Sequence, residues 1–121
     1  MDKEELKKRT KDFSHRCVKL ALNLPNTILG KHLQDQLIRC STSVAANYRA
    51  ACVAQSKASF TAKLSIVIEE SDESLFWLEF INEEKLIKKE LLEPLIKEAG
   101  ELTAIFIASR KTIQKSIINN K

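Results

Sequence analysis

The feature that most constrains this sequence is an apolar stripe at helical spacing between residues 28 and 54. Side chains that favour burial recur there at steps of three and four: Leu33, Leu37, Cys40, Val44, Tyr48 and Ala51. Because an α-helix completes a turn every 3.6 residues, this spacing places them along one side of a single long helix. Small residues such as Ala45 and Ala46 lie beside the stripe and permit close approach. The segment therefore predicts a helix that packs tightly against other helices.

Three other segments carry similar stripes, and few residues in the chain break helices. The sequence contains two Gly and two Pro among 121 residues, which favours long helices over a turn-rich fold. Pro25 ends the first predicted helix, and Ser56 is suited to cap the third. The predicted helices span residues 3–24, 28–54, 56–82 and 89–118. Their similar lengths and short connections predict an all-α fold, a single domain over residues 1–121 folded as an antiparallel up-down-up-down four-helix bundle.

Polar residues interrupt the apolar stripes of the two central helices. Gln36, Ser43 and Asn47 mark the second helix, while Ser71 and Ser74 interrupt the third. A buried amide or hydroxyl costs about 1–3 kcal/mol when it lacks a partner, so such residues need contacts that fix how the helices meet. We interpret them as a polar layer that also uses charged residues, although those charged members would equally suit a solvated surface. The predicted layer comprises Gln36, Arg39, Ser43, Asn47, Arg49, Glu70, Ser71 and Glu73.

The residue patterns of catalytic, metal and phosphate sites are missing from the sequence. His15 and His32 each stand alone, and the acidic cluster at residues 69–73 lacks the His spacing of a di-iron site. No Ser or Cys has an evident base to activate it. Neither Gly30 nor Gly100 has a glycine nearby with which to form a phosphate loop. We therefore predict that the protein is not an enzyme and uses no cofactor and no metal.

Cysteine positions and hydropathy bear on the compartment. Cys17, Cys40 and Cys52 are an odd number within apolar helical segments, so we interpret them as reduced thiols that fill space. No apolar run approaches the roughly 18 residues of a membrane span. The charged start from Met1 to Lys11 also lacks the apolar core of a signal peptide. We expect a cytoplasmic protein that does not interact with membranes.

Charge and aromatic residues are distributed unevenly along the chain. The net charge is +4, yet residues 56–86 contain seven acidic and three basic side chains. Opposite charges would order the pairing of neighbouring helices, or else the basic helices would offer a surface to a polyanion. Phe76, Trp77 and Phe80 crowd more than one face of the third predicted helix. Because a monomeric bundle covers one stripe per helix, these aromatic residues point to self-association.

Three stretches of the sequence resemble a known family. Residues 36–51, QLIRCSTSVAANYRAA, look like the signature of the four helix bundle family, which is also called the 23S rRNA-intervening sequence proteins. A second block supports the resemblance, with residues 54–57, Phe60, and residues 63–64, 69–74 and 76–79, and a third block comprises residues 98–103 and 109–112. Many members read Asn-Ile-x-Glu-Gly at the end of the signature, where this chain has Asn47-Tyr48-Arg49-Ala50-Ala51. A role of that Glu-Gly form is therefore not transferred to this chain.

The resemblance carries implications for fold and partners. It implies a homo-oligomeric ring, a homopentamer, with no known catalytic activity. Arg39, Ser43 and Asn47 fall in the family's second-helix motif, and Glu70, Ser71 and Glu73 fall where its third-helix motif lies. Related accessory proteins of retroelements bind nucleic acid and a reverse transcriptase, which makes RNA or DNA candidate partners.

Together these observations predict a non-enzymatic, self-assembling interaction module with nucleic-acid binding through basic surfaces. Repetition of a weak basic patch around a ring would strengthen such binding. The alternative is a purely structural or protein-binding scaffold, with an unidentified protein partner and no affinity for nucleic acid. The candidate nucleic-acid contacts are Lys7, Lys8, Arg9, Lys11, Arg110, Lys111 and Lys115.

Overall fold

The computed structural model describes residues 1–119, which form four α-helices and no strand. The helices are α1 (Lys3–Ala21), α2 (Ile28–Cys52), α3 (Lys57–Glu83) and α4 (Lys89–Asn119). The prediction of an all-α fold with four helices is confirmed. Residues 120 and 121 of the predicted domain lie outside the described residues.

Side-chain caps determine where three of the helices begin. Asp2 accepts a hydrogen bond from the Glu5 amide at 2.8 Å, and Thr27 accepts one from the Gly30 amide at 3.0 Å. The Ser56 hydroxyl accepts a hydrogen bond from the Ser59 amide, in the first turn of α3, at 3.0 Å. The first amides of a helix have no partner within it, so these oxygens satisfy groups that would otherwise lack one.

The first two helices end earlier than the sequence predicted. α1 ends at Ala21 rather than at residue 24, because the Asn23 and Leu24 amides bond to carbonyls three residues back. Such bonds make a tighter turn than the α-helix, and Pro25 disfavours helical geometry at the residue before it. α2 ends at Cys52 rather than at residue 54 for the same hydrogen-bonding reason. The bounds of α3 and α4 lie within one residue of those predicted.

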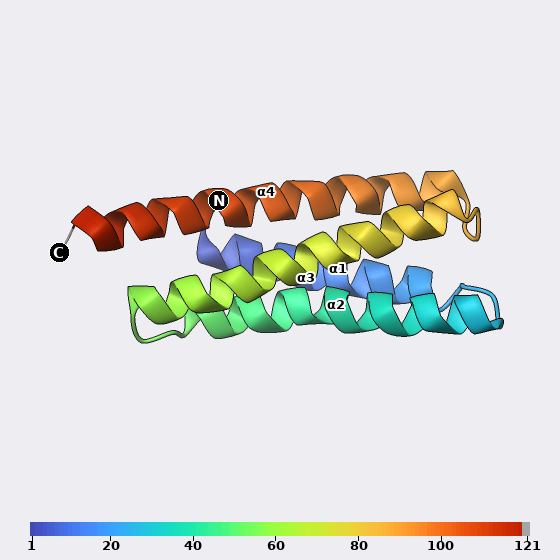
Figure 1. Ribbon diagram of the computed structural model, residues 1–121, viewed down its shortest axis with the longest axis horizontal. Coiled ribbons are helices and arrows are strands. Elements are labelled where there is room, and N and C mark those ends of the chain that lie inside the picture. The colour runs from blue at the N-terminus through green and yellow to red at the C-terminus, as the bar shows by residue number, and fades with distance from the viewer. Residues whose placement is uncertain (120–121) are drawn as a thin grey trace.

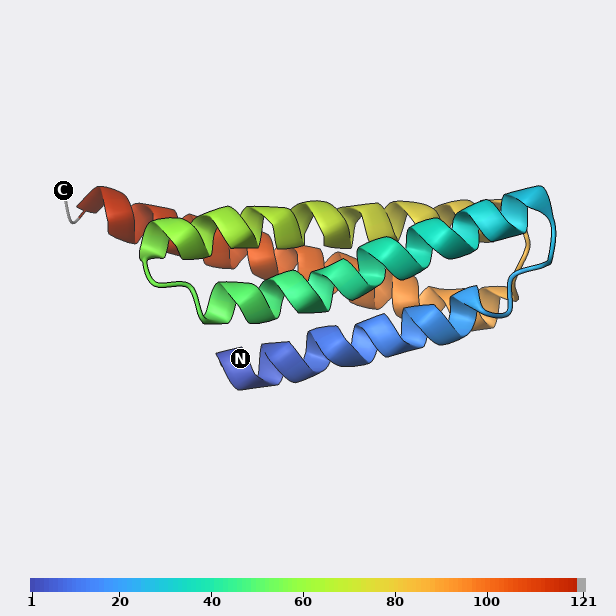
Figure 2. The same cartoon turned by 90° about the horizontal axis from the view of Figure 1, so that it is seen from below.

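Each helix packs against its neighbours in a closed order. α2 contacts α1 and α3, α3 contacts α4, and a smaller contact joins α4 to α1. In the described residues the backbones of α1 and α3, and those of α2 and α4, do not approach closely, and only side chains join them across the bundle. Tyr48 of α2 packs against Phe106 of α4 at 5.4 Å between ring centroids, and Lys3 Nζ of α1 lies 4.9 Å from the Phe60 ring of α3. The chain turns back at every connection, so the N-terminus and the end of α4 lie at the same end of the molecule (Figure 1). Figure 2, the view from below, also shows α4 extending past α1 and α3 at that end.

The core follows the predicted stripes. All six residues of the α2 stripe are buried, and so are five apolar residues within the first predicted helix: Leu6, Phe13, Cys17, Leu20 and Leu24. On α4 the fully buried positions end at Phe106, and the residues beyond it are half-buried or exposed, although Arg110 and Ser116 still bond to Ser65 and Lys57 of α3. Within residues 1–119, no helix has both the length and the continuous apolar character that crossing a membrane requires.

Candidate nucleic-acid interface and the polar network

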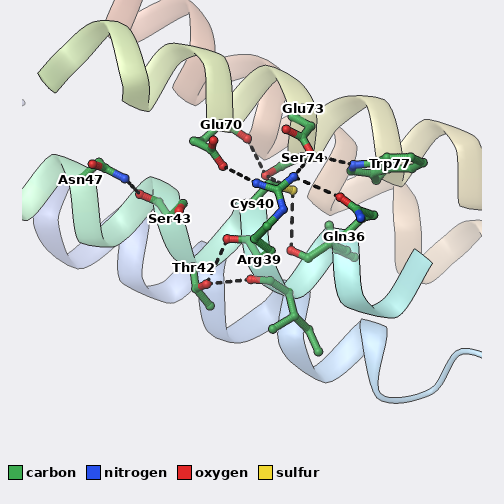
Figure 3. Close-up of polar contacts among 12 residues, drawn as sticks. Gln36, Arg39, Cys40, Thr42, Ser43, Asn47, Glu70, Glu73, Ser74 and Trp77 are labelled. Atoms are coloured by element: carbon green, nitrogen blue, oxygen red, sulfur yellow. Dashed lines mark hydrogen bonds and ion pairs between the residues drawn. The ribbon is translucent and has the colours of Figure 1, made fainter. Parts of the chain in front are cut away.

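Arg39 lies at the centre of a polar network between α2 and α3 (Figure 3). Its Nη1 donates to Glu70 Oε2 at 3.3 Å, and its Nη2 donates to Gln36 Oε1 at 3.1 Å. The same Nη2 also donates to Glu73 Oε2, which accepts the indole N–H of Trp77 at 3.0 Å as well. The structure thus brings together Gln36, Arg39, Glu70 and Glu73 of the predicted polar layer.

The carboxylates of this network are better shielded than the arginine that holds them. The Glu70 side chain is 19% exposed, against 48% for Arg39. Burial raises the pKa of Glu70 above its ordinary value, while the Arg39 guanidinium opposes that rise. Arg39 is shared among three acceptors on two helices, so its planar fork fixes their relative position by charge-assisted bonds. Arg39 therefore links α2 to α3 through its bonds to Glu70 and Glu73.

Other predicted members of the layer lie elsewhere. The Asn47 amide donates to the Ser43 carbonyl at 3.0 Å within α2, and neither side chain bonds to α3 in residues 1–119. The prediction that Gln36, Ser43 and Asn47 are buried is wrong, because they occupy the flank of the α2 stripe and are half-buried. Ser71 is fully buried but bonds to Thr103 of α4, with 2.9 Å between the hydroxyl oxygens.

Buried hydroxyls that the polar layer did not include join the helices. Ser14 of α1 donates to the Ser41 carbonyl of α2 at 2.6 Å, and Ser74 of α3 contacts Cys40 Sγ at 3.3 Å. The Ser41 hydroxyl is itself buried without a partner among the described residues. Ser14 and Ser41 sit directly beside Phe13 and Cys40 of the apolar stripes, and that position is the sequence signal that would have identified them.

Two thiols lie in the same core region. Burial raises the pKa of Cys17 to about 12 and that of Cys40 to about 11. Both are therefore neutral at physiological pH, where a thiol is a poor nucleophile and a poor metal ligand. Across residues 1–119, no three His, Cys, Asp or Glu side chains lie together in an arrangement able to hold a metal ion.

Arg9, predicted as a nucleic-acid contact, is engaged by α4 instead. Its Nε and Nη2 donate to the two Glu98 oxygens at 2.7 and 2.6 Å, and Nη2 also lies 2.7 Å from Glu101 Oε2. The hydrogen bonds from Arg9 hold the pKa of Glu98 below its ordinary value, and the pKa of Arg9 is raised in turn. Because its Nε and Nη2 are occupied by carboxylates of α4, Arg9 joins α1 to α4, and its Nη1 contacts Met1 Sδ at 3.9 Å.

The other predicted cations of α1 face Arg49 of α2 across a groove of about 550 Å³. Lys7 is paired with Glu4 at 2.8 Å, whereas Lys8, Lys11 and Arg49 are exposed and make no ion pair within residues 1–119. Small residues of α2 separate the long cationic side chains. The structure thus assigns Arg49 to this basic groove and not to the polar layer. The basic groove is lined by Glu4, Lys7, Lys8, Lys11, Ala45, Ala46 and Arg49.

A second set of predicted cations lies near the end of α4. Lys111 and Lys115 are exposed, and Arg110 is half-buried with its Nη1 3.4 Å from Ser65 Oγ. The start of α1 lies at the same end of the molecule (Figure 1). Lys7 and Lys8, in the first half of α1, and Lys111 and Lys115, near the end of α4, therefore lie toward the same end of the fold although they are far apart in the sequence.

Comparisons with known proteins agree with this architecture. The sequence model described as 23S rRNA-intervening sequence protein matches residues 2–108. A solved structure, described as a protein of unknown function from the S23 ribosomal protein family of Bacteroides thetaiotaomicron VPI-5482, is 30% identical with a TM-score of 0.81. The match covers 92% of this chain and 99% of that one. A search of curated proteins gave no match. The family match includes α1, α2 and α3 in full, and the chain belongs to the 23S rRNA-intervening sequence protein family.

Proposed function

We propose that this protein is a non-enzymatic, self-assembling bundle of the cytoplasm that binds RNA or DNA phosphates through the basic groove. In this proposal the antiparallel up-down-up-down protomer assembles into a homo-oligomeric ring, and a homopentamer is the form that the family resemblance suggests. The observation that carries the proposal is the convergence of Lys8, Lys11 and Arg49, from two helices, on a groove that contains one carboxylate.

The groove suits a phosphate backbone for electrostatic reasons. Nucleic acid binding that depends on phosphates releases condensed counterions, and each cation that contacts a phosphate steepens the dependence on salt. Lys8, Lys11 and Arg49 have no carboxylate to displace within residues 1–119. Ala45 and Ala46 present little side-chain bulk between them. Such a surface favours binding independent of sequence, and a ring would present several copies of it at once.

Fluorescence anisotropy with a labelled RNA hairpin and a DNA duplex tests the proposal over a range of salt concentrations. The variant Lys11→Gln/Arg49→Gln should bind more weakly and should reduce the slope of log K against log salt by about two for each occupied groove. Lys97→Gln is the matched control, because Lys97 is an exposed helical lysine on α4, away from the α1–α2 groove.

Two results would contradict the nucleic-acid role. One is the absence of detectable affinity for either probe at low salt. The other is equal weakening by the groove variant and by Lys97→Gln, which would mean that general charge and not the groove governs binding. Under the first result the protein is a structural or protein-binding scaffold whose charge serves solubility.

A further inference from the structure

The outward face of α3 carries an aromatic surface that the bundle does not cover. Phe76 is 52% exposed, and its ring packs edge-on against Trp77 at 4.9 Å between centroids and lies tilted against Phe80 at 6.1 Å. The inward face of the same helix is buried against α2 and α4. A helix that is apolar on two faces is normally covered on both, and an exposed aromatic cluster commonly marks an interaction surface.

Carboxylates surround this aromatic surface. Glu69, Asp72, Glu79 and Glu83 are exposed on α3, each within two helical turns of Phe76. Within residues 1–119 none of the four makes an ion pair, in contrast to Glu70 and Glu73, which bind Arg39. We call Phe76 and these four carboxylates the Phe76 face. Its partner should therefore offer an apolar recess with cations at the rim.

The α1–α4 contact provides such a recess on the same molecule. A groove of about 310 Å³ there is lined by Leu20, Leu91, Pro94 and Leu95 among others, and Leu91 is 61% exposed. Its α1 rim carries Arg16 and Lys19, which make no ion pair within the described residues, while Glu90 lies on the α4 side. We call it the α1–α4 groove. An aromatic side chain between carboxylates complements this combination in shape and in charge.

The positions of the two surfaces allow both to be used at once. α3 and α1 are not adjacent in the closed order of the helices, so the outward side of α3 and the α1–α4 groove lie on different faces of the bundle. The end of α1, the end of α3 and the start of α4 all lie at the same end of the molecule, away from the termini (Figure 1). A contact between two different patches is heterologous, and it generates a ring when the rotation between copies closes.

We propose that the Phe76 face of one copy docks into the α1–α4 groove of the next copy. This inference rests on the proposed self-assembly and names the two surfaces that mediate it. Phe76 enters the apolar recess, and Asp72 and its neighbouring carboxylates face Arg16 and Lys19 of the adjoining protomer. Each copy has one face and one groove, so every protomer in a closed ring is covered at both.

Light scattering coupled to size-exclusion chromatography, over a range of protein concentrations, tests the pairing. Phe76→Ser, Asp72→Lys and Lys19→Glu should each raise the dissociation constant of the assembly by about tenfold or more. The combined variant Asp72→Lys/Lys19→Glu should recover much of the loss, because the opposite charges again face each other across the contact. Asp35→Lys is the matched control, since Asp35 is exposed on α2 outside both surfaces. Circular dichroism verifies that each variant remains helical.

Three results would overturn the inference. Retention of the full assembled mass by Phe76→Ser and by both single charge reversals would place the contact elsewhere. If Asp35→Lys lost as much assembled mass as the variants at Phe76, Asp72 and Lys19, the loss would not depend on the two proposed surfaces. A wild-type protein that stays monomeric at all concentrations would refute self-assembly along with its surfaces. Nucleic-acid binding by the basic groove is measured separately, with substitutions at Lys11 and Arg49, so its failure is distinguishable from each of these results.

Discussion

The ion pair between Arg9 and Glu98 should contribute substantially to the α1–α4 contact, the smallest in the bundle. Arg9 and Glu98 are 89 residues apart in the sequence and share two hydrogen bonds of 2.6 and 2.7 Å. Removing Glu98 breaks these two bonds, and removing Arg9 also breaks its bond to Glu101. Arg9→Met retains the length of the aliphatic stem, and Glu98→Gln retains the shape of the carboxylate. The two single variants and the double variant make a double-mutant cycle that isolates the interaction.

The expected size of the effect follows from how the pair is shielded. The Arg9 and Glu98 side chains are 24% and 15% exposed, between a surface pair and a buried one. Exposed pairs contribute about 0–1 kcal/mol, and a hydrogen bond to a charged group contributes about 1.5–3 kcal/mol. Allowing for solvent access to Arg9, we expect a coupling energy of about 2 kcal/mol and a fall in Tm of about 6–12 °C in each single variant.

Thermal and urea unfolding at a fixed protomer concentration and at several pH values measures the coupling. The pKa of Glu98 is lowered in the folded state, so its contribution is complete above its unfolded-state pKa of about 4.3 and is lost as the pH falls through the folded-state pKa. Glu93→Gln is the control, since its pair with Lys89 is exposed on both sides. A coupling energy below about 0.5 kcal/mol at pH 7, or one unchanged at acidic pH, would refute the reasoning.

Two other pairs of substitutions test the packing through thermal unfolding. Gly30→Ala should lower the free energy of unfolding by about 2–3 kcal/mol, because the new Cβ would overlap the Pro25 carbonyl. Gly100→Ala has no neighbour near the new Cβ and should raise the free energy of unfolding by about 0.5–1 kcal/mol. If both substitutions changed the free energy of unfolding in the same direction, the packing around the two glycines would differ from that described. Thr103→Val should lower the free energy of unfolding by about 1 kcal/mol, because it removes the hydrogen bond to Ser71. Adding Ser71→Ala to Thr103→Val should recover part of this loss. If the wild type and both variants were equally stable, the hydrogen bond would contribute nothing to stability.

The sequence predicted the helices better than it predicted their polar contacts, and spacing explains the difference. A step of three or four residues places Leu37 and Cys40 on one face, and that face is buried. Gln36 and Asn47 follow a similar spacing, yet they lie on its flank, since periodicity alone cannot separate the centre of a stripe from its edge. The partner of Arg9 depends on which helices become neighbours, which only tertiary packing determines.

The two proposed roles occupy opposite ends of the bundle, and this separation has a mechanical consequence. The basic groove is lined by residues 4–11 of α1, near the terminal end of the bundle, whereas the α1–α4 groove is lined by residues 16–20 of α1 and the start of α4, at the far end. Phe76 lies in the second half of α3, which ends at that far end (Figure 1). A ring joined at the far end would leave every basic groove open at the terminal end, so that one long nucleic acid contacts several grooves. Phe76→Ser would then keep the intrinsic affinity of each groove for a short oligonucleotide. Its affinity for a long one should fall, because the linkage between grooves is lost.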